Sequence, residues 1–397
     1  MRNIRLNSLN IKVLIFCLII VQSIGIRFFN GQGIFLSVIV ILLSFKNFKK
    51  LKITDIRFLF LMFLFLLCSK LINPSFSFSS LIYVISLIIS SYLFLVGYRK
   101  NRDRLQRDFF AALQIFVFHA FIGYVIYLLF PKQFIEFNPL NKSFYNLFYV
   151  STSAFGNFQR NTGLFWEPGV FQLVANFYLF YCIKFNKSNK ILFLAICSVV
   201  SSLSTSGLIV LMINFIYILY LKWKSKKIKF TNIFLLVILA VAFIPIIGSN
   251  VKDKINEDNT SALVRYRDFN IGLELIKEKP IMGHGVFDSE YLKKKQYVKK
   301  WESNLFSTEY LDEAGEMGGG YTNGFIGLIA WYGIPASILL YLIYLKNKFV
   351  DTDRIERFLF NLIMLISLIS EPVSYTSLFM MFPFTYIIFD KNLKRYA

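Results

Sequence analysis

The sequence is poor in the residues that form disulfide frameworks and metal centres. Its four cysteines all lie inside apolar runs and form no CxxC pair, so neither a disulfide framework nor a zinc site is indicated. Only two histidines occur, at positions 119 and 284. We therefore predict no metal and no cofactor.

Charged residues are scarce as well. They make up 17% of the chain, against about a quarter in soluble domains, while 56% of the residues are hydrophobic. The apolar residues occur in long runs and not in periodic stripes. This composition predicts an all-α polytopic membrane protein, because helices satisfy their own backbone groups in lipid.

The apolar runs predict about 12 transmembrane helices and three parts of the chain. Residues 1–247 would hold helices 1–9 with an outer loop at 131–168. Residues 248–322 would form a large, partly helical extracytoplasmic loop, and residues 323–397 would hold helices 10–12 and a cytoplasmic C-terminus. The first span is interpreted as an uncleaved helix, because no small-residue cleavage site follows it. The predicted spans are 11–29, 33–45, 56–72, 80–98, 109–130, 169–184, 191–204, 207–221, 230–247, 323–345, 358–370 and 376–389.

The basic residues are distributed as this topology requires. With both termini cytoplasmic, the formal net charge of +21 falls on the inner side, where the short basic loops at 45–52, 98–107 and 222–229 lie. This asymmetry follows the positive-inside rule. The basic residues form short turns and no continuous patch, which disfavours a nucleic-acid partner.

Ionisable residues are few near the centres of the predicted spans, and no internal repeat is visible. Ion-coupled transporters and pumps usually bury such residues at the midplane, and many transporters have inverted repeats. Both absences weaken the case for a transporter. A flippase or exporter of lipid-linked oligosaccharide stays an alternative, because twelve spans fit it equally well.

The outer loop at 248–322 is longer than an ordinary connection, and part of it has a helical pattern. Thr260 is a plausible N-cap, and the pattern closes before Pro280. Arg265 and Arg267 lie on opposite flanks of an apolar stripe, so we expect a helix on the membrane surface that points both arginines toward lipid head groups. The residues of the stripe are Leu263, Tyr266, Phe269, Leu273 and Ile276.

The segment QRNTGLFWEPGVFQ carries an arginine and a glutamate at the entrance of an apolar run. Pro168 marks the first turn of a helix, so Glu167 lies at the positive end of the helix dipole. Arg160 lies seven residues before Glu167, and Gly163 between them permits a turn. One interpretation is a helix start with an interfacial tryptophan. In the other, Glu167 orients Arg160 or accepts a proton from a substrate hydroxyl.

This segment resembles the R-x-x-G-x-x-x-E-P motif of the O-antigen polymerase and O-antigen ligase superfamily of membrane glycosyltransferases. Three further elements follow in the order found in that superfamily, and together they cover roughly residues 150–340. They are the Ser/Thr-rich turn LSTSGL at 203–208, the arginine, helix, proline and G-x-G of the large loop, and the helix entry YTN at 321–323. The loop element is matched by Arg265, Pro280, Gly283 and Gly285, with Phe269 where the superfamily often has tryptophan.

The resemblance implies a metal-independent enzyme that uses a polyprenyl-pyrophosphate-linked donor. It implies catalytic roles for Arg160, Glu167, Arg265 and His284, and substrate contacts for Arg267, Tyr321 and Asn323. The alternatives are solvated helix flanks for the arginines, a solvated loop position for His284, and a helix cap for Tyr321 and Asn323.

The chain departs from the ligases at one position. Ligases usually carry histidine before the asparagine, whereas Thr322 precedes Asn323 here. This favours a polymerase that joins repeat units of O-antigen, capsule or exopolysaccharide at the outer face of the bacterial cytoplasmic membrane. A ligase-type glycan transferase is the alternative. The partner implied is an undecaprenyl-pyrophosphate-linked oligosaccharide, with a chain-length regulator and a flippase as further partners in the same membrane.

Overall fold

The structure is a computed structural model of the 397-residue chain. It describes residues 10–25, 31–130, 154–155, 158–226, 245, 248, 260–286, 322–350, 353–374 and 376–389. The predicted span at 230–247 lies outside the described residues apart from Pro245.

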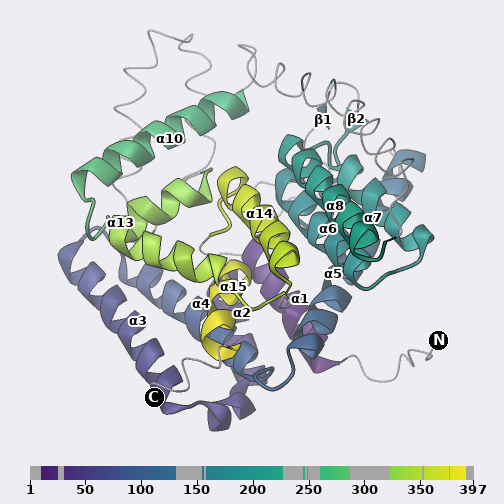
Figure 1. The fold of residues 1–397 in the computed structure, drawn as a ribbon. Helices are drawn as coiled ribbons and strands as arrows, with labels where there is room; N and C mark the ends of the chain where they lie inside the picture. The colour runs from purple at the N-terminus through teal and green to yellow at the C-terminus, as the bar shows by residue number, and fades with distance from the viewer. Residues whose placement is uncertain are drawn as a thin grey trace.

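Within the described residues, helices occupy the other predicted spans, and a two-residue antiparallel ladder is the only sheet (Figure 1). The helices of the N-terminal part are α1 (Ile11–Ile24), α2 (Gln32–Leu43), the 3-10 helix η1 (Phe45–Lys50), α3 (Ile53–Ile72), α4 (Phe78–Val96) and α5 (Arg102–Leu129). The ladder pairs β1 (Ala154–Phe155) with β2 (Phe158–Gln159). The later helices are α6 (Pro168–Lys184), α7 (Asn189–Ser201), α8 (Thr205–Lys224), α10 (Thr260–Glu278), α13 (Gly324–Leu345), α14 (Arg354–Ser370) and α15 (Ser377–Phe389).

The helical class is confirmed, but the count of about 12 spans is not. Among the described residues, four helices are long and apolar enough to cross a membrane: α4, α5, α8 and α13. Four shorter apolar helices are α1, α2, α7 and α15. The apolar helices indicate a membrane protein.

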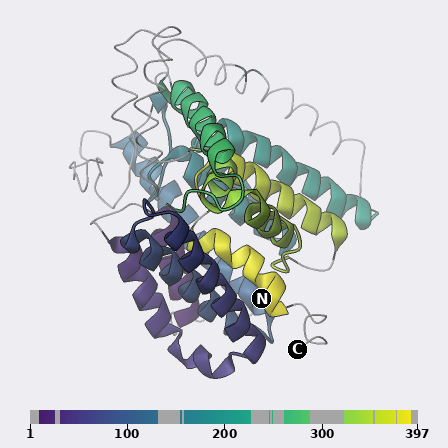
Figure 2. The same ribbon diagram turned by 90° about the vertical axis from the view of Figure 1, so that its left-hand side faces the viewer.

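Helix α6 lies at the centre of one half of the molecule. It packs against α5, α7 and α8, and every residue from Pro168 to Ile183 is buried. Its residues are mostly apolar, and the buried Gln172 and Asn176 hydrogen-bond each other, as is expected for a helix in an interior position. In the other half, α4 packs against α2, α3 and α15 (Figures 1 and 2). Helix α6 has 17 residues, so its two ends lie about 25 Å apart, at opposite ends of the bundle that it forms with α5, α7 and α8.

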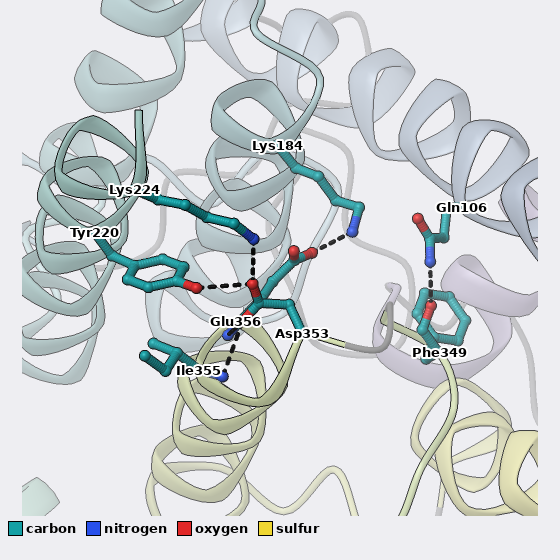
Figure 3. Close-up of polar contacts among 8 residues, drawn as sticks. All are labelled: Gln106, Lys184, Tyr220, Lys224, Phe349, Asp353, Ile355 and Glu356. Carbon is teal, nitrogen blue, oxygen red and sulfur yellow. Dashed lines mark hydrogen bonds and ion pairs between the residues drawn. The ribbon is translucent and has the colours of Figure 1, made fainter. Parts of the chain in front are cut away.

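The C-terminal end of α6 belongs to a group of ion pairs and hydrogen bonds (Figure 3). Lys184 of α6 pairs with Glu356 in the first turn of α14. Lys224 and Tyr220 of α8 donate to Asp353 at 2.5 and 2.7 Å. The ends of α6 and α8 thus meet the beginning of α14, which agrees with the predicted alternation of span directions.

Asp353 also caps α14, since its Oδ1 accepts the backbone N–H groups of Ile355 and Glu356 at 3.0 and 3.1 Å. Burial acts to raise the pKa of Asp353, but the hydrogen bonds from Lys224 and Tyr220 outweigh it, so the pKa lies below its usual range. The charged carboxylate therefore stabilises the fold above the unfolded pKa of about 4, and this contribution is lost as the pH falls through the lower folded pKa.

Asp353→Asn and Asp353→Ala separate the cap from the ion pair. Asparagine keeps the cap, so Asp353→Asn should cost less than Asp353→Ala, which loses about 1 kcal/mol from the cap alone. Thermal unfolding in detergent measures both. The difference in unfolding temperature between wild type and Asp353→Asn should be largest near neutral pH and should become smaller below about pH 4. A difference that is constant with pH would contradict the role of the carboxylate charge.

Helix α13 does not form the single straight span predicted at 323–345. Its backbone is non-helical at Gly333, with φ 78° and ψ 168°, and Pro335 follows. The two limbs, 324–332 and 334–345, fold toward each other beneath α10 (Figure 1). The rings of Phe325 and Tyr341 stack with centroids 4.4 Å apart, whereas a straight helix would separate these residues by about 24 Å.

The loop 280–285 completes the hydrogen bonds of the broken helix. The backbone N–H groups of His284 and Gly285 donate to the carbonyl oxygens of Ala330 and Trp331 at 2.9 and 3.0 Å. The N–H of Ile334 donates to the Pro280 carbonyl oxygen at 2.7 Å. A helix can break in an apolar environment only where other groups bond the freed backbone. The proline and the G-x-G segment therefore belong to a loop that stabilises the break in α13.

Gly333 is required at the break for two reasons. Its φ and ψ lie in a region open essentially to glycine alone, and a Cβ there would overlap the backbone of Ile281. We expect Gly333→Ala to lower the free energy of unfolding by at least the 1–3 kcal/mol estimated for such backbone strain. Thermal unfolding of purified protein tests this value.

Gly31→Ala is the matched control for this substitution. Gly31 also has positive φ, at 82°, but no described atom lies within 4 Å of a Cβ built there. Its ψ of 0° places it in the left-handed helical region, where alanine costs about 1–2 kcal/mol, so Gly31→Ala should cost less than Gly333→Ala. Equal losses for Gly31→Ala and Gly333→Ala would contradict the close packing of the loop in the break.

Candidate functional site

Arg160 is held by the turn between α7 and α8. Its Nε donates to the Ser202 carbonyl oxygen at 3.1 Å. The neighbouring Asn161 donates its backbone N–H to the Ser201 carbonyl oxygen at 2.9 Å and its side-chain amide to the Ser201 hydroxyl at 3.0 Å. Leu203 in this turn has φ 46°, which non-glycine residues rarely adopt. The Ser/Thr-rich turn therefore positions Arg160.

Gly163 permits the chain to turn between Arg160 and Glu167. Its φ is 56°, and a Cβ would lie 2.8 Å from the Cβ of Ala120 on α5. Its backbone N–H donates to the Asn161 side chain at 3.1 Å. The glycine of the R-x-x-G-x-x-x-E-P segment is thus needed both for its backbone conformation and for its close approach to α5.

Glu167 is the N-cap residue of α6, with Pro168 as the first helical residue. Its side chain makes no capping hydrogen bond, and the residue is exposed. The carboxylate therefore lies at the positive end of a buried helix without being used to cap it. It is accessible to a ligand at this end of the bundle.

Arg265 reaches the same end from α10. The helix runs from Thr260 to Glu278, as the sequence predicts. The guanidinium of Arg265 lies 3.9 Å from Oε1 of Glu371, and the Arg265 side chain is 43% exposed. Glu371 follows the last residue of α14 and is 2% exposed. The sequence places Glu371 only in a short turn and does not identify it as a site residue.

The carboxylate of Glu371 lies against Gly169 in the first turn of α6. A Cβ at Gly169 would overlap Oε1 of Glu371, so the absence of a side chain makes room for the carboxylate. Burial lowers the pKa of Arg160, while the charges of Glu167 and Glu371 act to raise it and that of Arg265 acts to lower it. We call these two arginines and two glutamates, gathered around the start of α6, the charged cluster.

Arg267 does not point outward with Arg265. It is 4% exposed and pairs with the adjacent, buried Asp268 at 3.2 Å. The other carboxylate oxygen of Asp268 accepts the backbone N–H of Thr322 at 3.1 Å. The expectation that both arginines reach lipid head groups is wrong, because the buried face of α10 includes Arg267 and Asp268.

The apolar stripe predicted on α10 is also not the buried face. Tyr266 and Phe269 of that stripe are 48% and 41% exposed, whereas Ile271 and Leu275 are fully buried. The sequence pattern located the helix correctly but predicted the wrong buried face, since the buried residues lie about half a turn away from the stripe. The buried face packs on α13.

His284 lies at the opposite end of α10 from Arg265. It is 2% exposed, and its Nε2 lies 3.0 Å from the Leu275 carbonyl oxygen and 3.8 Å from Oε2 of Glu278. Leu275 is about 15 Å along the helix from Arg265. The structure therefore does not bring His284 to the charged cluster, and its backbone belongs to the loop that bonds the break in α13.

Asn323 forms the N-cap of α13. Its Oδ1 accepts the backbone N–H groups of Phe325 and Ile326 at 2.9 and 3.1 Å. A Cβ on Gly324 would lie 2.8 Å from the Glu371 carbonyl oxygen, so α13 begins beside the charged cluster. Tyr321 lies outside the described residues.

The two arginines of the charged cluster are groups suited to bind an anion, while its two glutamates offset their formal charge. Two guanidinium groups and the N-terminal ends of α6 and α13 supply positive potential there, and helix N-termini favour phosphate groups. Arginine binds phosphate bidentately and stays cationic. Among the residues that the structure describes, no group of three or more His, Cys, Asp or Glu side chains could hold a metal ion.

Residues 191–341 match the model of a protein family described as O-antigen ligase. The match extends from α7 to α13 and includes Arg265, while Arg160, Glu167 and Glu371 lie outside it. None of the curated proteins and none of the solved structures matches the chain. The resemblance to the O-antigen polymerase and ligase superfamily is thereby confirmed for this part of the chain.

Proposed function

Taking the chain as a member of the O-antigen polymerase and ligase superfamily, which the match at residues 191–341 supports, we propose that it polymerises polysaccharide repeat units. The growing glycan would be transferred from undecaprenyl pyrophosphate to a lipid-linked repeat unit at the outer face of the cytoplasmic membrane. The observation that carries this proposal is the charged cluster. It brings Arg160 and Arg265, which are far apart in sequence, to one end of α6.

In the proposed reaction, the bond between the anomeric carbon and the diphosphate oxygen breaks, and the diphosphate leaves with the electron pair. A hydroxyl oxygen of the acceptor sugar forms the new bond to the anomeric carbon. Its proton passes to Glu167, whose exposed carboxylate lies at the start of α6. No nucleotide is consumed, because the lipid diphosphate is itself the leaving group.

Arg160 and Arg265 stabilise the charge that builds on the departing diphosphate. The two side chains are held differently, since Arg160 is bonded to the α7–α8 turn and Arg265, which is 43% exposed, faces Glu371. Burial lowers the pKa of Arg160, but the guanidinium group of arginine stays charged in proteins, so Arg160 acts as a cation. Fixed donors aimed at developing charge contribute about 3–4 kcal/mol to transition-state stabilisation.

A second candidate function is a ligase that moves finished glycan to a different acceptor. The description of the matching family favours it. Thr322 stands where ligases usually carry histidine, and the one histidine of the large loop in the described residues, His284, is buried away from the charged cluster. These two observations support the polymerase as the first choice.

Purified protein and a synthetic undecaprenyl-pyrophosphate-linked repeat unit test the proposal. A polymerase should convert this single substrate into a ladder of products that differ by one repeat, and EDTA should not change the rate. A ligase would leave the repeat unit unextended and transfer it only when a separate acceptor is added. A flippase would form no new glycosidic bond in either reaction.

A further inference from the structure

We infer that Glu371 is a positioning residue for the proposed transfer. It lies between α6 and α10, and it holds the guanidinium of Arg265 beside Arg160. The inference rests on the proposed function and deepens it, because it names a residue outside both the superfamily motifs and the matched range.

The backbone of Glu371 is held by three contacts. Its N–H donates to the Ser367 carbonyl oxygen at 3.0 Å, and its own carbonyl oxygen accepts the N–H of Val373 at 2.8 Å. Gly324 at the start of α13 packs against the same carbonyl oxygen. The residue therefore has a defined position between the end of α14 and the start of α13.

The side chain is fixed just as closely. The carboxylate rests on Gly169 in the first turn of α6, where no side chain intervenes. Burying a carboxylate is costly unless positive charge compensates it. The N-terminal end of α6 and the two arginines supply that charge. Glu371 is thus the buried member of the ion pair and packs against α6, and Arg265 is its more exposed partner.

The 3.9 Å contact orients Arg265 without covering it. One guanidinium nitrogen faces Glu371, and an arginine has five N–H donors in a fixed fork. The side chain is 43% exposed, so Arg265 can contact a phosphate group while it faces Glu371. Arg265 belongs to α10, whereas Arg160 is bonded to the α7–α8 turn. The contact with Glu371 therefore holds the Arg265 guanidinium near that of Arg160.

A direct role in proton transfer fits Glu371 less well than Glu167. Glu371 is 2% exposed, which keeps an acceptor sugar from reaching its carboxylate, while Glu167 is exposed at the same end of α6. We therefore assign different roles to the two glutamates. Glu167 faces the substrate, and Glu371 acts through Arg265.

Glu371→Gln, Arg265→Gln and the double variant test the inference in the purified system. We expect Glu371→Gln to raise the KM for the lipid-diphosphate donor about tenfold, a coupling typical of charged neighbours. In the Arg265→Gln background, Glu371→Gln should have little further effect. A merely structural residue would not show this dependence on Arg265. Glu274→Gln is the control, because Glu274 is an exposed acidic residue of α10.

Gly169→Ala gives a second route should Glu371→Gln not accumulate as folded protein. It keeps the carboxylate but displaces it from α6, so the KM for the donor should rise as in Glu371→Gln. The same substitution in a Glu371→Ala background should have little effect, since the overlapping group is gone.

The outcomes separate this inference from the proposed function. Transfer by wild type together with an unchanged donor KM in Glu371→Gln, or additive effects with Arg265→Gln, would overturn the inference alone. Absence of transfer by folded wild-type protein would overturn the proposed function and the inference with it.

Discussion

Lysine in place of Arg160 or Arg265 is expected to stop chain elongation while leaving a folded protein. Each change should lower kcat/KM about 10²–10³-fold, the loss found when one fixed donor is removed from a developing charge. Lysine keeps the charge but lacks the planar fork that binds phosphate bidentately. At position 160 it also loses the Nε that donates to the Ser202 carbonyl oxygen.

Initial rates of ladder formation by purified variants measure this loss, and polymer length profiles in cells provide an independent readout. Lys277 offers a control on α10, because it is an exposed basic residue in the last turn of that helix. Lys277→Gln and Arg265→Gln each remove one positive charge from α10. Only the second should lower kcat/KM strongly, about 10²–10³-fold, which leaves a residual rate that the purified system can measure. Wild-type polymer lengths from both Arg→Lys variants would count against the role of the charged cluster.

Glu167→Gln is expected to lower kcat about 10²–10⁴-fold, the usual contribution of a general base. The amide cannot accept the proton of the acceptor hydroxyl, whereas contacts that bind the donor diphosphate stay in place. The KM for the donor should therefore change little. Since Glu167 does not cap α6 with its side chain, the substitution should lower the free energy of unfolding only through the loss of its charge at the helix start, by about 0.3–1 kcal/mol. A Glu167→Gln variant with normal kcat would show that another group accepts the proton.

The two largest effects therefore differ in kinetic signature. Loss of an arginine removes donors from the leaving diphosphate, and loss of Glu167 removes the base for the incoming hydroxyl. Loss of Glu371 should appear as a donor KM change that depends on Arg265. These three signatures let the members of the charged cluster be told apart in one assay.

The sequence alone determined where the chain is helical. In an apolar environment each backbone group must be bonded within its own segment, so long apolar runs predict helices without knowledge of their neighbours. The bounds of α10 followed from local signals too, because Thr260 begins it and Pro280 lies just beyond its end. Arg160, Glu167 and Arg265 were found through motif spacing, which reflects short stretches of chain.

Only the tertiary structure decided which of these residues meet. Gly333 bends α13 into two limbs because the loop 280–285 bonds the freed backbone, and composition alone predicts a continuous span there. Arg267 and His284 look as accessible as Arg265 in the sequence but are buried. Glu371 joins the charged cluster through Gly169, some two hundred residues earlier in the chain. Such contacts depend on how distant helices pack, and a local pattern of residues carries no record of that packing.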